Sequence, residues 1–320
     1  MVPDIKHKKN SNDDPYVSIV IPTYKRPEKV IVAVNSVLHQ TFENIEVIVV
    51  IDGKCNATSK ALSLIKDSRL IIHELKHNAG QNAARNKGLS LSKGKYVALL
   101  DDDDEWLPDK LSIQVERCKN STYTFPVAVC KAIARTPKGC YIWPRRFPST
   151  GQHISEYLFR RTSLFAGEAF IQTSGLLFEK AILRYVNFEE KLKVHDDWQW
   201  ILEVSNLNGA GFEFIDEPLY IYNCEQHESE TSKTKWKQSL EWIQGHLTAE
   251  TITKNAYSSF VMISVGSNLA KERKWNLFFL PLKLATAKGT PQFIDYILYI
   301  GFWIFPPHLR QVIRSIFLKK

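Results

Sequence analysis

The sequence predicts an α/β fold, in which helices flank a mostly parallel sheet and a helical extension follows. Three observations support this fold class. Short apolar runs alternate with amphipathic segments over about the first 120 residues, as strands and helices do in parallel sheets. Polar or acidic residues directly follow several of these runs, at the strand ends where such sheets bind ligands. From about residue 233 onward the pattern is mostly helical.

The first strand is expected at residues 17–21, a mostly β-branched run that leads into Pro22, Thr23 and Tyr24. Pro27 suits the first turn of the helix that follows. Apolar residues at helical spacing give this helix one buried face: Val30, Ala33, Val34, Val37 and Leu38. A second strand is expected at residues 46–51 and ends at Asp52 and Gly53.

The next segments continue this alternation. We expect a helix over residues 57–66, a strand over 69–74, a helix over 81–92 and a buried strand over 96–100. Trp106, Leu107 and Pro108 are expected to open another helix. Beyond about residue 120 the pattern loosens, with strands expected near 127–134, 174–178 and 219–222 and a helix over 197–204.

The composition is that of a folded protein, with 44% hydrophobic and 12% aromatic residues. The five cysteines are odd in number and form no CxxC pair, so we expect reduced thiols and a cytosolic protein. The first 14 residues are polar, which argues against a signal peptide.

The net charge of +8 is concentrated near the end of the chain. Residues 268–320 carry nine basic and two acidic side chains, and nine minus two leaves +7. The first 267 residues are therefore close to neutral, which argues against nucleic acid as a partner. A basic, aromatic-rich segment instead suggests contact with an anionic membrane surface.

Four consecutive aspartates, Asp101 to Asp104, follow the strand expected at residues 96–100. Their carboxylates repel one another, and a hard cation that binds carboxylate and phosphate oxygens would offset this repulsion. A solvated acidic turn is the alternative. Tyr24, Asp52 and the aspartates should meet at one edge of the sheet. We therefore expect a nucleotide site there, although the chain has neither a GxGxxG nor a P-loop motif.

Six segments together carry a family pattern. They are VSIVIPTYKR at 17–26, SVLHQTF at 36–42, VVIDG at 49–53, NAGQNAARN at 78–86, LDDDDEWLP at 100–108 and HDDWQW at 195–200. In order and spacing they closely resemble the family-2 glycosyltransferases, including members that act in bacterial polysaccharide biosynthesis. The resemblance covers about residues 16–230.

This resemblance implies a GT-A (Rossmann-like) fold and an inverting hexosyl- or N-acetylhexosaminyl-transferase that uses Mn²⁺ or Mg²⁺. We expect a polar tail at residues 1–15, a GT-A domain at 16–230 and a helical extension at 231–320. Residues 16–120 would bind the nucleotide sugar, and residues 121–230 would bind the acceptor. A UDP-sugar is expected as donor ahead of GDP- and dTDP-sugars.

The resemblance also implies roles for individual residues. Asp52 would contact the nucleotide base, in a pocket lined by Pro22, Thr23 and Tyr24. Asp103 would be the main metal ligand and Asp102 would contact the ribose or the metal, while Asp101 and Arg85 would meet the donor. His227 lies where the family often has a histidine near the donor and metal; a surface loop histidine is the alternative.

Asp197 is the candidate general base. An acceptor hydroxyl is a poor nucleophile near neutral pH, so a carboxylate must take its proton during the transfer. Asp196 would support the metal site or the loop, and helix capping by both aspartates is the alternative. The chain departs from the family pattern at Ile51, which replaces the first Asp of Asp-Asp-Gly, and at Gln199, where an acidic residue is common.

Residues 293–305 are strongly apolar but too few to span a bilayer, and basic residues follow them. We expect an interfacial segment, and a helix packed on the catalytic domain is the alternative. Membrane contact would fit a polyprenyl-linked glycolipid acceptor and a peripheral location at the inner face of a bacterial membrane.

The sequence thus predicts an enzyme that transfers one sugar to a glycan or glycolipid in capsule, O-antigen or exopolysaccharide assembly. Two other function classes stay open. A non-catalytic nucleotide-sugar-binding module would lack the base or the metal ligands, whereas Asp103 and Asp197 are present. A sugar-nucleotide pyrophosphorylase would have a glycine-rich loop after the first strand, and residues 22–26 contain no glycine.

Overall fold

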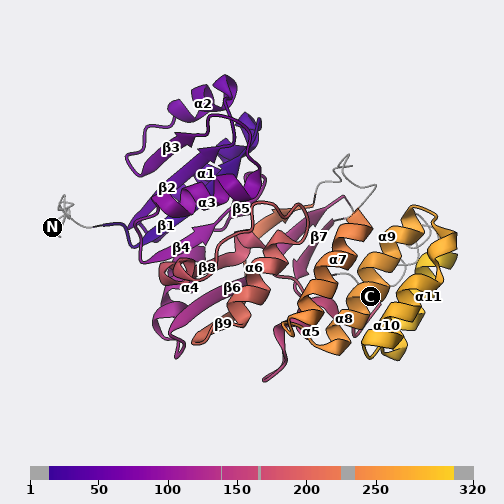
Figure 1. Cartoon of the computed structure of the whole chain (residues 1–320). Coiled ribbons are helices and arrows are strands. Elements are labelled where there is room, and N and C mark those ends of the chain that lie inside the picture. Colours follow the sequence, from indigo (N-terminus) through magenta and orange to yellow (C-terminus); the bar gives the residue numbers. More distant parts are fainter. Residues whose placement is uncertain (1–13, 138, 165–166, 225–234, 306–320) are drawn as a thin grey trace.

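A mixed sheet forms the centre of the computed structural model, which describes residues 14–137, 139–164, 167–224 and 235–305 (Figure 1). Among these residues the strands run in the order β3-β2-β1-β4-β8-β6-β9-β5, and β7 pairs with β6 beside this path.

The first half of the sheet is parallel, as the sequence predicted. Its strands are β1 (Val17–Thr23), β2 (Ile45–Ile51), β3 (Leu70–Glu74) and β4 (Tyr96–Leu99). The helices between them are α1 (Pro27–Leu38), α2 (Asn56–Ser63) and α3 (Gln81–Leu91). Because parallel strands end at the same edge of a sheet, the segments after β1, β2 and β4 lie close together.

The second half of the sheet has mixed directions. Its elements are β6 (Phe125–Thr136), β7 (Gly139–Trp143), α5 (Ile154–Phe159), β8 (Leu176–Glu179), α6 (Asp196–Ser205) and β9 (Ala210–Asn223). β8 is antiparallel to β4 and β6, whereas β6 and β9 are parallel. The strand expected at residues 219–222 is only the end of β9. Pairing with β6 extends this strand back through acidic residues that interrupt its apolar pattern.

The prediction that Trp106 opens a helix is wrong. Trp106 belongs to β5 (Glu105–Trp106), which pairs with β9. Its indole Nε1 donates to the backbone oxygen of Ser174 at 2.9 Å. The helix α4 (Lys110–Lys119) begins only after Pro108. Pairing with distant segments therefore overrides the local helix signal of Pro108.

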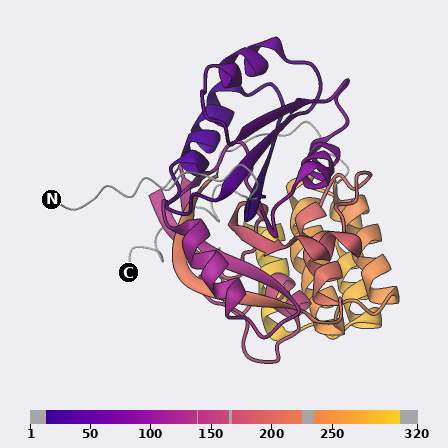
Figure 2. The same ribbon diagram turned by 90° about the vertical axis from the view of Figure 1, so that its left-hand side faces the viewer.

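Apolar side chains are buried on both faces of the sheet, in the alternation typical of strands. On one face Val17, Ile19 and Ile21 of β1 pack with α1 and α4. On the other face Val20 belongs to a larger cluster, which continues through α5 and α6 into the C-terminal helices. Figure 2 shows these helices gathered against one side of the sheet, with α4 on the other side.

The expected C-terminal helices are present and share this core with the sheet. They are α7 (Lys235–Thr248), α8 (Lys254–Phe260), α9 (Gly266–Lys271), α10 (Phe279–Lys288) and α11 (Phe293–Ile304). A π-helical turn at Val261–Val265 joins α8 to α9.

The last helix, α11, covers most of the segment at 293–305 and agrees with the packed-helix alternative, while the interfacial role stays a prediction. It buries Asp295, Tyr299 and Trp303, so it does pack on the rest of the protein. It also exposes Phe293, Ile297, Ile300 and Ile304. Of the helices in the described part of the chain, none has the length and apolar character needed to cross a membrane.

Candidate active site

A cavity of about 600 Å³ opens where β1, β2 and β4 end. Eight of the residues that the sequence singled out line it: Pro22, Thr23, Tyr24, Asp52, Asp101, Asp102, Asp103 and Asp197. The fold therefore brings the ends of three strands and the start of α6 to one place. Arg85 is buried beside this group rather than on the cavity wall, and His227 lies outside the described residues.

Asp102 and Asp103 share one guanidinium group. Arg26 Nη1 donates to Asp102 Oδ1 at 2.9 Å and to Asp103 Oδ2 at 3.0 Å. The Thr23 hydroxyl donates to the other oxygen of Asp102 at 2.7 Å. Burial raises the pKa of Asp102, although its hydrogen bond from Thr23 and the positive charge of Arg26 oppose this rise.

These two carboxylates fit a divalent cation, because a positively charged group already bridges them. Within the described ranges no three His, Cys, Asp or Glu side chains are grouped as a complete metal site. Mg²⁺-type sites often use only one or two carboxylates and take their remaining ligands from substrate phosphates and water. The expected Mn²⁺ or Mg²⁺ could be held here in that way.

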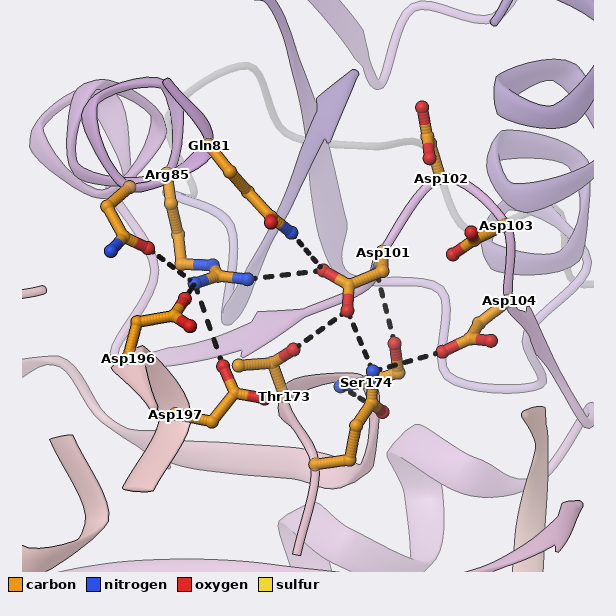
Figure 3. Close-up of polar contacts among 12 residues, drawn as sticks. Gln81, Arg85, Asp101, Asp102, Asp103, Asp104, Thr173, Ser174, Asp196 and Asp197 are labelled. Carbon is orange, nitrogen blue, oxygen red and sulfur yellow. Dashed lines mark hydrogen bonds and ion pairs between the residues drawn. The ribbon is translucent and has the colours of Figure 1, made fainter. Parts of the chain in front are cut away.

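Asp101 and Asp104 belong instead to a hydrogen-bonded cluster (Figure 3). Asp101 accepts hydrogen bonds from the side chains of Gln81, Arg85, Gln172 and Thr173. Asp104 accepts from Gln172 Nε2 at 3.2 Å and from the backbone N–H of Asn223 at 3.0 Å. Burial raises the pKa of Asp104 to about 8, and the negative charge of Asp101 adds to the rise. These bonds fix the loop that presents Asp102 and Asp103.

Arg85 connects the aspartate loop to α6. Its side chain is only 1% exposed, and its guanidinium carbon lies 4.6 Å from the ring centre of Phe188. Nη2 donates to Asp101 Oδ1 at 3.2 Å, and Nη1 donates to Asp196 Oδ2 at 3.1 Å. The same Nη1 lies 3.8 Å from Asp197 Oδ1. The expected contact of Arg85 with the donor stays a prediction.

Asp197 lies in the first turn of α6 and lines the cavity. Burial raises the pKa of Asp197 to about 7; Arg85 opposes this rise, while the negative charges of Asp196 and Asp101 add to it. A side chain that titrates near neutral pH can accept a proton under physiological conditions. Its position and its pKa both suit the general base predicted from the sequence.

Asp52 holds the loop that precedes α3. Its two carboxylate oxygens accept hydrogen bonds from the backbone N–H groups of Ala79 at 2.7 Å and Gly80 at 3.0 Å. The next residue, Gly53, has φ +90°, and a Cβ there would lie 2.7 Å from the backbone nitrogen of Asn78. The Asp-Gly pair thus has a structural reason, and contact between Asp52 and a nucleotide base stays a prediction.

The sequence assigned no role to several residues that line the cavity. Arg26 and Gln81 lie inside the recognised segments at 17–26 and 78–86, so those segments could have pointed to them. Gln172, Tyr222 and Asn223 reach the cavity from the second half of the sheet. No pattern in the sequence marks these three, because only the folded sheet brings them to this edge.

Asp102, Asp103 and Asp197 thus line one cavity, at the edge where the parallel strands β1, β2 and β4 end. This is the edge at which α/β sheets bind nucleotides. Residues 18–184 match the family described as Glycosyl transferase family 2. This match spans more than half of the chain, so the protein belongs to that family and is a glycosyltransferase.

Relatives of this chain include proteins named for bacterial polysaccharide biosynthesis. The chain is 29% identical over 261 residues to the amylovoran biosynthesis glycosyltransferase AmsB of Erwinia amylovora, covering 75% of this chain and 82% of AmsB. Over 99 residues it is 39% identical to WfaP of Escherichia coli, covering 31% of this chain and 39% of WfaP. WfaP is named as a UDP-Glc:α-D-GlcNAc-diphosphoundecaprenol β-1,3-glucosyltransferase.

Solved structures confirm the fold. S. aureus TarS 1-349, in complex with UDP-GlcNAc, superposes with a TM-score of 0.58 at 18% identity and covers 90% of each chain. The mannosyltransferase PcManGT of Pyrobaculum calidifontis, in complex with GDP-Man and Mn²⁺, gives a TM-score of 0.55 at 16% identity. That match covers 96% of this chain and 86% of PcManGT.

Proposed function

We propose that this protein is an inverting glycosyltransferase that moves one sugar from a nucleotide-diphosphate sugar to a hydroxyl of a glycan or glycolipid. One observation carries the proposal. The same cavity is lined by Asp102 and Asp103, which can bind a cation, and by Asp197, which can accept a proton. Inversion needs only one carboxylate base on the face opposite the leaving group.

The residues in and beside the cavity have separate roles in the reaction. A divalent cation, when held by Asp102 and Asp103, would neutralise negative charge on the departing nucleoside diphosphate. Asp197 takes the proton of the acceptor hydroxyl as the new bond forms. Arg85 stabilises the ionised form of Asp197 and fixes its position relative to Asp101.

The donor and acceptor classes rest on the relatives. The TarS structure contains UDP-GlcNAc, and the name of WfaP specifies UDP-glucose and an undecaprenol-linked acceptor. These names support a UDP-sugar donor and a polyprenyl-linked glycolipid acceptor for this chain. The AmsB relative supports a role in bacterial surface polysaccharide assembly.

A lipid-linked acceptor is reached most easily from a membrane surface, and we place the enzyme peripherally at the inner face of a bacterial membrane. The outer apolar face of α11 (Phe293, Ile297, Ile300 and Ile304) supports this location. Beside its C-terminal end the exposed Trp275 contacts Trp303, with 4.9 Å between ring centres. Exposed Lys271, Arg273 and Lys274 come just before Trp275. Apolar and basic groups in this combination suit an anionic bilayer.

Binding and turnover with a panel of UDP-, GDP- and dTDP-sugars test the function, each measured with Mn²⁺ and with EDTA. We expect one donor to bind only with metal, and Asp103→Asn to abolish that binding. Asp197→Asn should keep donor binding but lower turnover about 10²- to 10⁴-fold, as expected for loss of a general base. Asp216→Asn, at an 81% exposed site outside the cavity, is the matched control and should change neither.

Two results would contradict the proposal. If no donor binds under any metal condition while the control protein is folded, the non-catalytic reading replaces it. If sugar phosphate and a nucleoside triphosphate are interconverted with pyrophosphate, the protein is a pyrophosphorylase instead.

A further inference from the structure

The side chain of Arg26 occupies the place between the two carboxylates that suit the metal. One nitrogen, Nη1, donates to both Asp102 and Asp103 at about the same distance, 2.9 and 3.0 Å. Charge-assisted hydrogen bonds of this length are among the stronger polar contacts in proteins. A metal ion cannot bind the same oxygens at full strength while the guanidinium group remains there.

The backbone around Arg26 is fixed, whereas its side chain has room to move. Lys25 has a left-handed φ of 53°, and Pro27 occupies the first turn of α1. The backbone oxygen of Arg26 accepts the N–H of Val30 at 3.1 Å, which begins the helix. The side chain is 40% exposed and lines the cavity. The guanidinium group can therefore leave the aspartates without any change in the main chain.

We propose that the guanidinium group of Arg26 pairs with Asp102 and Asp103 when no donor is present. When the donor binds, this group moves away and the metal takes its place between the two carboxylates. The diphosphate of the donor gives Arg26 a new partner in the same cavity, because a guanidinium group matches phosphate geometry well. This inference rests on the proposed function, because it takes Asp102 and Asp103 as the metal ligands.

The proposal has a thermodynamic consequence. Without nucleotide, the metal must displace Arg26, so its affinity is low. With a diphosphate bound, Arg26 has moved to the phosphates, so the same metal binds without that cost. Metal and nucleotide therefore strengthen each other's binding, and by linkage each raises the other's affinity by the same factor.

Mn²⁺ binding, measured from the electron paramagnetic resonance signal of the free ion with and without UDP, tests this exchange without any turnover. We expect Arg26→Met to bind Mn²⁺ alone about tenfold more tightly than the unmodified protein, since hydrogen bonds to charged groups no longer have to be broken. The factor by which UDP tightens Mn²⁺ binding should fall in Arg26→Met, because the phosphates have lost the group that moves to them.

Lys25→Met is the matched control. It removes a positive charge from the adjacent residue, whose ammonium group lies over the ring of Tyr24, 5.0 Å from the ring centre. A general electrostatic effect would change Mn²⁺ affinity in both variants, whereas the exchange changes it only in Arg26→Met. Equal effects in the two variants, or Mn²⁺ binding by Arg26→Met that is no tighter than in the unmodified protein, overturn the proposal. Thermal unfolding of each variant checks that it is folded.

Asp103→Asn separates failure of this inference from failure of the proposed function. If Asp103→Asn abolishes Mn²⁺ binding but Arg26→Met leaves it unchanged, the metal assignment stands and the role of Arg26 is wrong. If Asp103→Asn leaves Mn²⁺ binding unchanged, the metal lies elsewhere and both proposals fail.

Discussion

Aspartates of the run at 101–104 pair with two different arginines, and these arginines differ in how deeply they are buried. Arg85 is buried and pairs with Asp101 and Asp196, so it belongs to a fixed framework. Arg26 is partly exposed and pairs with Asp102 and Asp103, so it can move. Asp101 and Asp104 are the two ends of a turn, in which the N–H of Asp104 donates to the backbone oxygen of Asp101 at 3.1 Å. The carboxylates at the ends of the turn hold the loop, and the two in the middle can take a ligand.

The pH dependence of activity should report the titration of Asp197. Its folded-state pKa is raised to about 7, so at pH 6 most of the base is protonated and inactive. We expect kcat/KM to rise about tenfold per pH unit below pH 7 and to level off above it, because kcat/KM follows the free enzyme. This acidic limb of the pH profile is measured by determining kcat/KM at a series of pH values with the preferred donor and acceptor.

Asp196→Asn supplies the internal check on that assignment. The negative charge of Asp196 helps to raise the pKa of Asp197, so its removal should move the acidic limb to lower pH. Asp196 is partly exposed, with 27% of its side chain accessible, and the variant should fold. A limb that does not move, or one already centred near pH 4, would show that another group is titrating.

Part of this site could be predicted from the sequence. The apolar run at 96–100 was enough to place Asp101–Asp104 at a strand end, and the structure confirms that placement. Which of the four turn inward could not be predicted. That choice is made by Gln172 and Thr173, whose contacts to Asp101 join residues 71 and 72 positions apart.

At the scale of elements, the base-bearing helix α6 is tied to α7 of the C-terminal extension. His195, just before α6, has a left-handed φ of 65°, and its Nε2 lies 2.7 Å from Ser239 Oγ of α7. Gln199 Oε1 is the acceptor for Trp242 Nε1 at 2.6 Å and lies 2.8 Å from His246 Nε2. The amide oxygen of Gln199 therefore ties α6 to α7, while its amide nitrogen donates to Glu203 Oε1 within α6.

Gln199→Ala should loosen this junction. It leaves the indole N–H of Trp242 without its acceptor in a largely buried place, which we expect to cost about 1–3 kcal/mol of the free energy of unfolding. Because α6 carries Asp197, kcat should fall while the Kd of the donor stays nearly constant. Denaturant unfolding and separate measurements of kcat and donor binding test both parts.

Glu203→Ala is the matched control for Gln199→Ala. Glu203 is exposed on the same helix and accepts a hydrogen bond from the amide nitrogen of Gln199 at 2.6 Å. Its loss should change the free energy of unfolding by about 0.5 kcal/mol or less, as is usual for surface positions. Equal effects of the two substitutions would mean that the contacts to α7 add nothing specific.

At the scale of the whole molecule, the parallel half of the sheet was predictable and the mixed half was not. From β1 to β4 each strand has its own apolar run and a helix separates it from the next, so the local pattern indicates every element. In the second half β5 and β9 pair across a long separation, as Trp106 with Tyr220 shows. Local pattern cannot anticipate such a pairing, and this is why the helix expected at Trp106 was wrong.

The position of α11 leads to a prediction for the whole molecule. In Figure 1, α10 and α11 form the outer side of the helical extension. Ile297 and Ile300 are 45% and 46% exposed on the outer apolar face of α11, although water disfavours such exposure. Replacing both with Gln removes apolar surface without adding charge. We expect partition onto phosphatidylglycerol vesicles to fall about tenfold in a flotation assay, with the fold unchanged.

Ile71 and Ile72 of β3 provide the control, because they are exposed to nearly the same extent, 39% and 40%, on a different part of the molecule. The double Gln variant at these positions should partition like the unmodified protein. Binding should also weaken in high salt and on phosphatidylcholine vesicles, because exposed Lys271, Arg273 and Lys274 add an electrostatic attraction to anionic lipid. If both double variants lose binding equally, or the unmodified protein does not float with anionic vesicles, α11 does not dock on the bilayer. Self-association that disappears only in Ile297→Gln/Ile300→Gln would instead make a second copy of the chain the partner of this face.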